Sequence, residues 1–413
     1  MLAILLIVNT YSQTPLKDFF TYIYCIPSSD SVTQLFYLYK IPTGDLIFSK
    51  NVNRYTASIQ ISVEVSDSNS LFIQRYFKDR TTTFEDFSLT LDPDSYIDGV
   101  ISFPIENRPL TVTSRFYDLN SQKEIFNKEQ SIHKIQNGDT PFLSPIILQK
   151  KPTRFGENEC RVLSNYGGFI PFDNNSYDVL IPVIDTTLEK LYIKVIASRD
   201  TVYNGTLDRR ELERNLISEF EGKIILSPDS TSTPKSQFYL TDLTDNLKEG
   251  PIDIIVSKSN DFQVIKSFRL IVKWLNKPRS LQNAETALRL LRFVIKDDSV
   301  KQILKSGDNY DSLLYKFWQK WDPSPNTQYN ELMAQYYDRI DYSMNSFSTI
   351  TGLSGLETDR AKIYIRYGKP TFVERGSNND GKISETWIYS KLEQKFIFVD
   401  EKGTGEFILK NNL

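Results

Sequence analysis

Apolar side chains occupy every second position between residues 55 and 65 of this chain, with mostly polar side chains between them. The apolar set is Tyr55, Ala57, Ile59, Ile61, Val63 and Val65. Successive side chains of a β-strand point to opposite faces, so the pattern predicts a strand with one buried face and one solvated face. Aromatic residues make up 13% of the sequence, mostly Tyr and Phe, and they suit the pleated surface of a sheet.

Similar short runs surround this segment and predict strand after strand. The candidates are residues 35–41, 46–48, 71–77, 87–91, 100–105 and 110–117, with turn signals such as Asp92-Pro93-Asp94 between them. A second series comprises 179–184, 191–196, 223–226, 237–240, 252–256 and 268–272. Short strands at this spacing are typical of β-sandwiches. We therefore expect two immunoglobulin-like β-sandwiches, at residues 13–147 and 148–276.

The period changes in residues 277–413, where helices are predicted over 280–347. Ser280 is a candidate cap for the first helix, and Pro323 and Pro325 end the third. Asn326 or Thr327 is predicted to cap a long helix. The chain is therefore expected to be mainly β with an α+β C-terminal part.

Strands are predicted again over residues 360–410 as a small antiparallel β-meander. Ile363, Ile365 and Tyr367 alternate with other residues, which favours a strand ending at Gly368. Asn379-Asp380-Gly381 is a hairpin signal.

The first twelve residues have the features of a signal peptide. The run from Leu2 to Val8 is apolar but too short to span a bilayer, and Thr10 and Ser12 give a small-x-small cleavage pattern before Gln13. We expect residues 1–12 to direct export across the inner membrane. A buried first strand is the alternative.

Charge and rare residues limit the possible functions. The net charge is 49 − 52 = −3, which disfavours nucleic acid as a partner. His133 is the single histidine, and Cys25 and Cys160 are the two cysteines, so His-rich and Cys₄ zinc sites are excluded. The cysteines are expected to be separate buried thiols. We predict no catalytic, cofactor-binding or metal site.

Acidic residues are the remaining candidates for chemistry. Asp92, Asp94 and Asp98 could form a paired-carboxylate or calcium site, although their spacing matches no defined loop. Nucleotide-binding glycine motifs and the Gly-x-Ser-x-Gly elbow are absent from the sequence.

Many C-terminal residues together resemble the GWxTD-domain proteins of bacteria. They are Phe317, Trp318, Asp322, Pro323, Pro325, Thr327, Asn330, Glu331, Tyr337, Arg339, Phe347, Gly355, Thr358, Asp359, Arg360, Ile363, Tyr364, Tyr367, Gly368, Pro370, Trp387, Phe398, Asp400 and Gly405. The motif here is Gly-Leu-Glu-Thr-Asp, because Leu356 replaces the tryptophan. The resemblance implies a secreted or envelope-associated protein and brings no catalytic chemistry.

Thr358, Asp359 and Arg360 form the sharpest polar cluster and have two interpretations. Asp359 and Arg360 could grip a ligand or partner. Alternatively, Thr358 or Asp359 bonds nearby backbone N–H groups and Arg360 pairs with an acid on the long helix.

The other motif residues favour structural roles. Arg339 is expected in a helix-surface or interdomain salt-bridge network, in which Asp338 and Asp341 crowd it. Glu331 is expected in the first turn of the long helix, where the helix dipole favours a carboxylate. Asp322-Pro323 is expected to stop the preceding helix.

The favoured function is therefore non-enzymatic. We expect a periplasmic or surface-associated protein that binds another envelope protein or a surface polymer. The alternatives are a carbohydrate-active enzyme, with at least two acids of raised pKa in a cleft, and a polysaccharide-binding protein, with exposed aromatic residues on one sheet face. Trp318, Trp321 and Trp387 are expected in the core.

Overall fold

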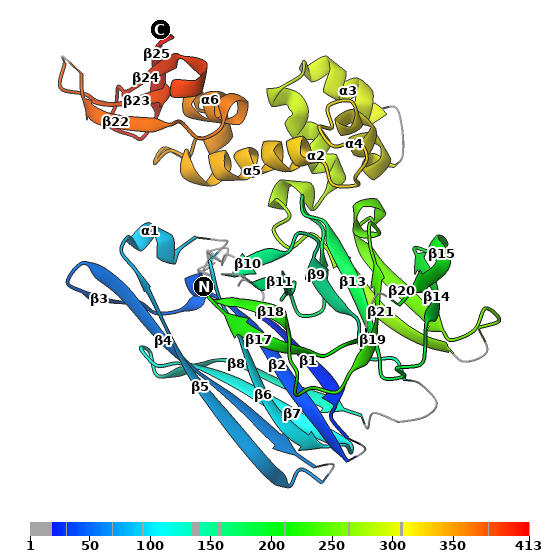
Figure 1. Cartoon of the computed structure of the whole chain (residues 1–413). Coiled ribbons are helices and arrows are strands. Elements are labelled where there is room, and N and C mark those ends of the chain that lie inside the picture. The colour runs from blue at the N-terminus through cyan, green and yellow to red at the C-terminus, as the bar shows by residue number, and fades with distance from the viewer. Residues whose placement is uncertain are drawn as a thin grey trace, which may run out of the picture. The chain divides into compact units, whose positions relative to one another are not determined.

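The computed structural model describes residues 19–412 except 30, 68, 93–94, 134–140, 156–157, 210–211, 263–264, 306–308 and 379. The predicted signal peptide lies outside the described residues. The chain divides into two compact units, Met1–Lys273 and Trp274–Leu413 (Figure 1). The described helices include none that is both long enough and apolar enough to span a bilayer.

The first sandwich is made of two sheets that face one another. One sheet has the order β1–β2–β6 and the other has β3–β4–β7–β8, with β5 on the free side of β4. The bounds are β1 Phe20–Pro27, β2 Val32–Pro42, β3 Ser49–Asn51, β4 Arg54–Ser66, β5 Phe72–Phe84, β6 Tyr96–Glu106, β7 Leu110–Asp118 and β8 Lys123–Ile132. The alternation over residues 55–65 is confirmed, because Ala57, Ile59, Ile61, Val63 and Val65 of β4 are fully buried against β2 and β6.

The second sandwich has sheets of order β16–β19–β13–β9 and β12–β21–β20–β14–β15. The first comprises β16 Leu212–Glu213, β19 Lys235–Leu240, β13 Tyr177–Val183 and β9 Ile146–Gln149. The second comprises β12 Ile170–Pro171, β21 Ile265–Lys273, β20 Gly250–Ser257, β14 Lys190–Ala197 and β15 Asp200–Asp208. One apolar core, which includes Val179, Ile193 and Ile254, joins their inner faces.

A further sheet, which the sequence did not predict, packs beside both sandwiches. Its order is β10–β11–β18–β17, with bounds Thr153–Phe155, Asn158–Val162, Lys223–Pro228 and Asn215–Phe220. Ile224 and Leu226 share a buried cluster with Phe36 and Leu38 of the first sandwich and Leu148 of the second. This cluster makes the sandwiches one compact unit.

The second unit begins with short helices and ends in a meander. The helices are η3 Arg279–Leu281, α2 Ala284–Leu290, η4 Leu291–Phe293, α3 Asp297–Lys305, α4 Tyr310–Gln319, α5 Glu331–Ser346, η5 Gly355–Glu357 and α6 Asp359–Tyr367. The sheet has the order β22–β23–β24–β25, with bounds Phe372–Ser377, Ile383–Tyr389, Gln394–Asp400 and Phe407–Asn412. Trp387, Phe396 and Phe398 are buried in this unit.

Several predicted boundaries were wrong because side-chain caps decide where helices begin. Asn283 caps α2 in place of Ser280, and Asn330 caps α5 in place of Asn326 or Thr327. Residues 87–91 are not a strand, because the Asp86 carboxylate accepts a hydrogen bond from Ser88 N and starts the short helix α1 Phe87–Thr90.

The predicted strand at residues 363–367 is also wrong, since these residues lie in helix α6. Thr358 caps its N-terminus, and Gly368, with φ +81°, ends it. Ala361 and Ile365 are both buried, at the i, i+4 spacing of one helix face. The predicted meander therefore begins at β22 rather than at residue 360. The predicted hairpin after β22 is confirmed.

Candidate functional site

Gly355 and Leu356 bring the motif against the end of α5. A Cβ on Gly355 would lie 2.2 Å from Ser343 O and 2.8 Å from Met344 O, so only glycine fits this approach. The Ser348 hydroxyl accepts a hydrogen bond from Gly355 N at 3.2 Å. Leu356 is 4% exposed and belongs to the core. The first half of the motif therefore packs the chain closely.

Thr358 connects that turn to α6. Its hydroxyl donates to Gly355 O at 2.7 Å and accepts from Ala361 N at 3.2 Å. The side chain is 3% exposed. Thr358 thus satisfies one of the free N–H groups at the start of a helix and is fully engaged.

Asp359 joins α6 to the edge strand β25. One carboxylate oxygen accepts from Leu409 N at 3.0 Å, and the other accepts from Lys362 Nζ at 2.8 Å. Burial acts to raise the pKa of Asp359, but these two hydrogen bonds outweigh it and hold the pKa below its ordinary value. Asp359 therefore covers a backbone N–H on the free side of β25.

Arg360 lies between two aromatic rings beneath the sheet. Its guanidinium carbon is 5.0 Å from the Phe347 ring centroid and 4.2 Å from that of Phe407. Its Nη1 is 3.5 Å from a Glu385 carboxylate oxygen, and its Nη2 donates to Gly405 O at 3.1 Å. Burial lowers the pKa of Arg360, and Glu385 partly offsets this effect.

Glu385, on β23, is the acid that the sequence placed wrongly on the long helix. It also accepts hydrogen bonds from Arg375 Nε at 3.0 Å and Trp387 Nε1 at 3.2 Å. The error follows from treating α6 as a strand, because the helix turns Arg360 toward the sheet. This constellation is an ion pair that ties a helix to a sheet.

The contacts around Thr358 occur in a region with a defined family. Residues 259–411 match the family described as the GWxTD domain. This part of the chain is similar to the GWxTD domain, and we name it after that match. The resemblance predicted from the sequence is therefore confirmed.

Other comparisons add little to this assignment. A search of curated proteins gave no match. The C-terminal domain of the antigen I/II-family protein AspA of Streptococcus pyogenes is 9% identical, covering 62% of this chain and 98% of that one, with a TM-score of 0.18. The C-terminal domain of the AgI/II polypeptide BspA of Streptococcus agalactiae is 10% identical, covering 62% and 99%, with a TM-score of 0.15. Scores this low carry no structural argument.

Arg339 of the GWxTD domain caps a helix rather than joining a salt-bridge network. Its Nη1 donates to Ile365 O at 3.2 Å and Arg366 O at 3.1 Å, which are carbonyls at the end of α6. A Cβ on Gly368 would lie 2.9 Å from Arg339 Nη2, so the glycine admits the guanidinium. Asp341 instead accepts from Arg279 N at 2.5 Å.

The remaining motif residues hold α4, α5 and the sheet. Asn330 accepts from Met333 N at 2.8 Å and donates to Trp318 O at 3.1 Å. Glu331 lies in the first turn of α5, as predicted. The Asp322 carboxylate accepts from Ser324 N at 2.9 Å, just before Pro323 in the loop after α4. Tyr367 packs 5.4 Å from Phe396, measured between ring centroids, and Pro370 immediately precedes Thr371 and β22.

The two edges of the GWxTD sheet differ in exposure. At β25, the backbone N–H of Leu409 donates a hydrogen bond to the Asp359 carboxylate. At β22, which is paired only with β23 within the described chain, all six residues are exposed. Phe372 is 63% exposed and Val373 is 44% exposed. In Figure 1, α6 lies beside β25 and away from β22.

Other candidates do not converge on a reactive site. Asp98 forms an ion pair with Lys40 at 2.8 Å and accepts a hydrogen bond from Asn165 at 2.9 Å. Burial raises the pKa of Asp98 and outweighs the lowering by these two partners. Asp94 lies outside the described residues, and His133 is exposed. Trp321 is wrongly predicted as core, being 62% exposed.

The two cysteines are free thiols on different strands. Cys160 is buried, as predicted, whereas Cys25 is only partly so. Burial raises the pKa of Cys25 to about 12, so its thiol stays protonated and unreactive at neutral pH.

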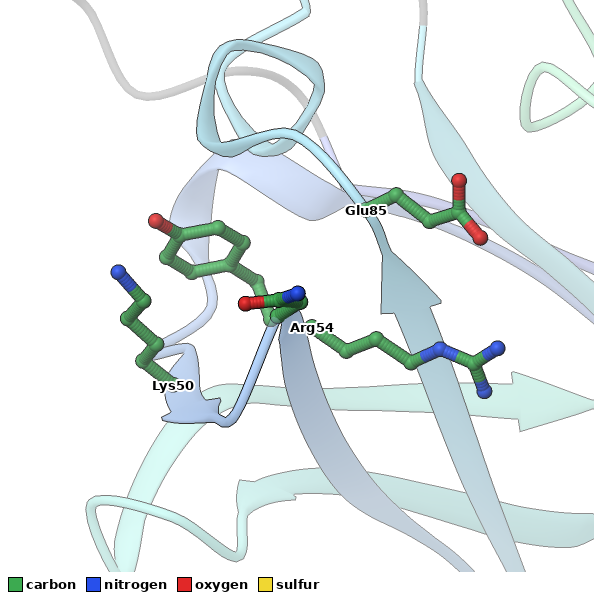
Figure 2. Close-up of a pocket in the computed structure, with 5 residues that line it drawn as sticks. Lys50, Arg54 and Glu85 are labelled. Carbon is green, nitrogen blue, oxygen red and sulfur yellow. The ribbon is translucent and has the colours of Figure 1, made fainter.

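A polar pocket of about 570 Å³ lies at the turn between β3 and β4. It is lined by Lys50, Asn53, Arg54, Tyr55 and Glu85. Lys50 Nζ lies 5.6 Å from the Tyr55 ring centroid. Figure 2 shows the Lys50 and Arg54 side chains extending in opposite directions. The two cations therefore do not grip one small anion.

Proposed function

We propose that this chain is a non-enzymatic, secreted or envelope-associated protein that binds another protein through the open edge of its GWxTD sheet. The observation that carries the proposal is the contrast between β25, whose Leu409 N–H is covered by Asp359, and β22, which is exposed along its whole length. An unpaired edge presents backbone donors and acceptors to a second chain.

The motif chemistry supports a scaffold role for the cluster around Arg360. Thr358 caps a helix, Asp359 covers an edge, and Arg360 pairs with Glu385 between two rings. These contacts hold α6 and the sheet in place. The cluster therefore serves to present β22 rather than to bind a substrate. The export part of the proposal is supported by the apolar run and the cleavage pattern of residues 1–12.

The test compares capture of envelope proteins by full-length chains that differ in two exposed apolar side chains. F372D/V373D alters β22, where the exposed fractions are 63% and 44%. I383D/L392D is the control, because its residues are 57% and 49% exposed and lie outside β22, Ile383 at the start of β23 opposite Ser377 and Leu392 in the short helix η6 (Ser390–Leu392) between β23 and β24.

After cross-linking in the native envelope, we expect at least one protein to be captured by the wild type and the control and lost from F372D/V373D. The surface that binds this protein should map to residues 372–377, whose amide exchange should slow in the purified complex. Equal capture by both double variants would contradict the proposal.

A further inference from the structure

The open strand β22 carries a charge order that restricts what can pair with it. Its sequence is Phe-Val-Glu-Arg-Gly-Ser over residues 372–377. Successive residues alternate between the two faces of the sheet, so Phe372, Glu374 and Gly376 share one face. Val373 and Arg375 lie on the other, opposite Trp387 and Glu385 of β23.

A second copy of β22 is a poor partner for this edge. Opposite residues in an antiparallel pair must both direct their backbone groups toward the partner or both away from it. In an antiparallel pair of identical strands, an even-numbered residue can therefore lie opposite an even-numbered one, and an odd-numbered residue opposite an odd-numbered one, but the two kinds cannot be mixed. In the two longest overlaps, either Glu374 faces its own copy or Arg375 does, and like charges directly opposite are destabilising.

A different protein can meet the same edge with complementary charges. A basic residue opposite Glu374 and an acidic residue opposite Arg375 both form favourable cross-strand pairs. The Glu374 carboxylate makes no ion pair with the described residues, and the Arg375 side chain is 78% exposed despite its contact with Glu385. Both charges are therefore accessible to a partner strand.

The remaining positions fix the rest of the pattern. Apolar residues suit the positions opposite Phe372 and Val373, which are themselves exposed and apolar. A Cβ on Gly376 would meet nothing within 4 Å, so an aromatic ring can lie over it.

We infer that β22 accepts, in antiparallel orientation, an extended segment of another protein with the order aromatic–acidic–basic–apolar–apolar. The inference rests on the proposed function and names the partner's chemistry. Main-chain hydrogen bonds supply affinity in this mode, and alternate side chains supply specificity.

The test uses two synthetic peptides with the purified full-length chain. One contains Tyr-Glu-Lys-Val-Ile between threonines, and the other exchanges its two charges to Tyr-Lys-Glu-Val-Ile. Binding is followed by the fluorescence polarisation of a dye on each peptide. We expect the first peptide to bind about fivefold more tightly, because two cross-strand charge pairs that are attractive with it become repulsive with the second peptide.

Glu374→Lys should reduce or reverse that preference, and F372D/V373D should abolish binding of both peptides. Equal binding of the peptides, binding that survives F372D/V373D, or no binding of either peptide would overturn the inference. If the peptide test fails but capture in the envelope still depends on β22, the inferred charge order is wrong and the proposed function stands. If capture does not depend on β22, the proposed function itself is wrong.

Discussion

The two edge strands of the GWxTD sheet end the same four-stranded sheet but differ in what covers them. At β25, the Asp359 carboxylate accepts from Leu409 N, and Arg360 stacks on Phe407. At β22, all six residues are exposed. The Thr-Asp-Arg part of the motif thus covers one edge and fixes the sheet on α6. On the proposed function, the motif affects binding through the position of the sheet and not by contact with a partner.

In the first sandwich, the edge strand β6 is covered by side chains, as β25 is. Gln74 and Lys78 of the edge strand β5 donate to Pro104 O at 3.2 Å and Val100 O at 2.8 Å on the edge strand β6. Pro104 has no N–H to offer on that edge. Side chains therefore cover backbone groups of β6 and β25, whereas β22 is exposed along its length.

The largest effect should come from Glu385→Gln, which leaves Arg360 buried without its countercharge. The side chains of Arg360 and Glu385 are 11% and 7% exposed. We expect a loss of about 3 kcal/mol in the free energy of unfolding. Urea unfolding followed by tryptophan fluorescence measures it, because all four tryptophans lie in residues 274–413. A loss below about 1 kcal/mol would show that the ion pair does not hold the sheet.

Gly355→Ala should come next, at about 2 kcal/mol, because the added methyl group meets the backbone of α5. Gly376→Ala is the control on the open strand, where nothing lies within 4 Å. Its stability should change by less than about 0.5 kcal/mol in the same urea experiment. Equal losses in both variants would contradict the close approach at Gly355.

Asp359→Ala should cost about 1 kcal/mol and expose the β25 edge. The amide of Leu409 should lose protection from hydrogen exchange, whereas Asp359→Asn, which keeps an acceptor oxygen, should retain part of it. Unchanged protection in Asp359→Ala would remove the contrast between the edges.

The same contact predicts a pH dependence. The pKa of Asp359 is lower in the folded chain, so its stabilisation is present above the unfolded pKa of about 3.9. It is lost as pH falls through the folded pKa. Urea unfolding of the wild type and Asp359→Asn between pH 3 and pH 7 should show a smaller difference at the acid end. A constant difference would be contrary to this linkage.

The smallest effect on stability should come from F372D/V373D. The two side chains are 63% and 44% exposed, so the free energy of unfolding should change by less than about 0.5 kcal/mol. Urea unfolding beside I383D/L392D checks this. A large loss would mean that β22 contributes to folding, and capture differences would then need another explanation.

The sequence predicted the parts of the fold that local pattern controls. Strict alternation over 55–65 identified β4, because the buried face of a sheet needs every second residue apolar. The same reasoning failed at Ile363 and Ile365, where Thr358 before the segment and Gly368 after it are the cap signals of a helix. Those signals were present and could have identified α6.

The site was less predictable than the fold. Arg360 meets Glu385 and Gly405, which lie 25 and 45 residues away, and only the three-dimensional path of the meander brings them together. The exposure of β22 also depends on which strand lies at the edge. Neither property is encoded in local periodicity.

The most direct test measures amide exchange at both edges of the GWxTD sheet, in the full-length chain alone and with the partner obtained by capture. We predict that Leu409 is protected in both states, while residues 372–377 exchange quickly alone and slowly in the complex. Slow exchange along β22 in the free chain, or unchanged exchange there on binding, would contradict the account.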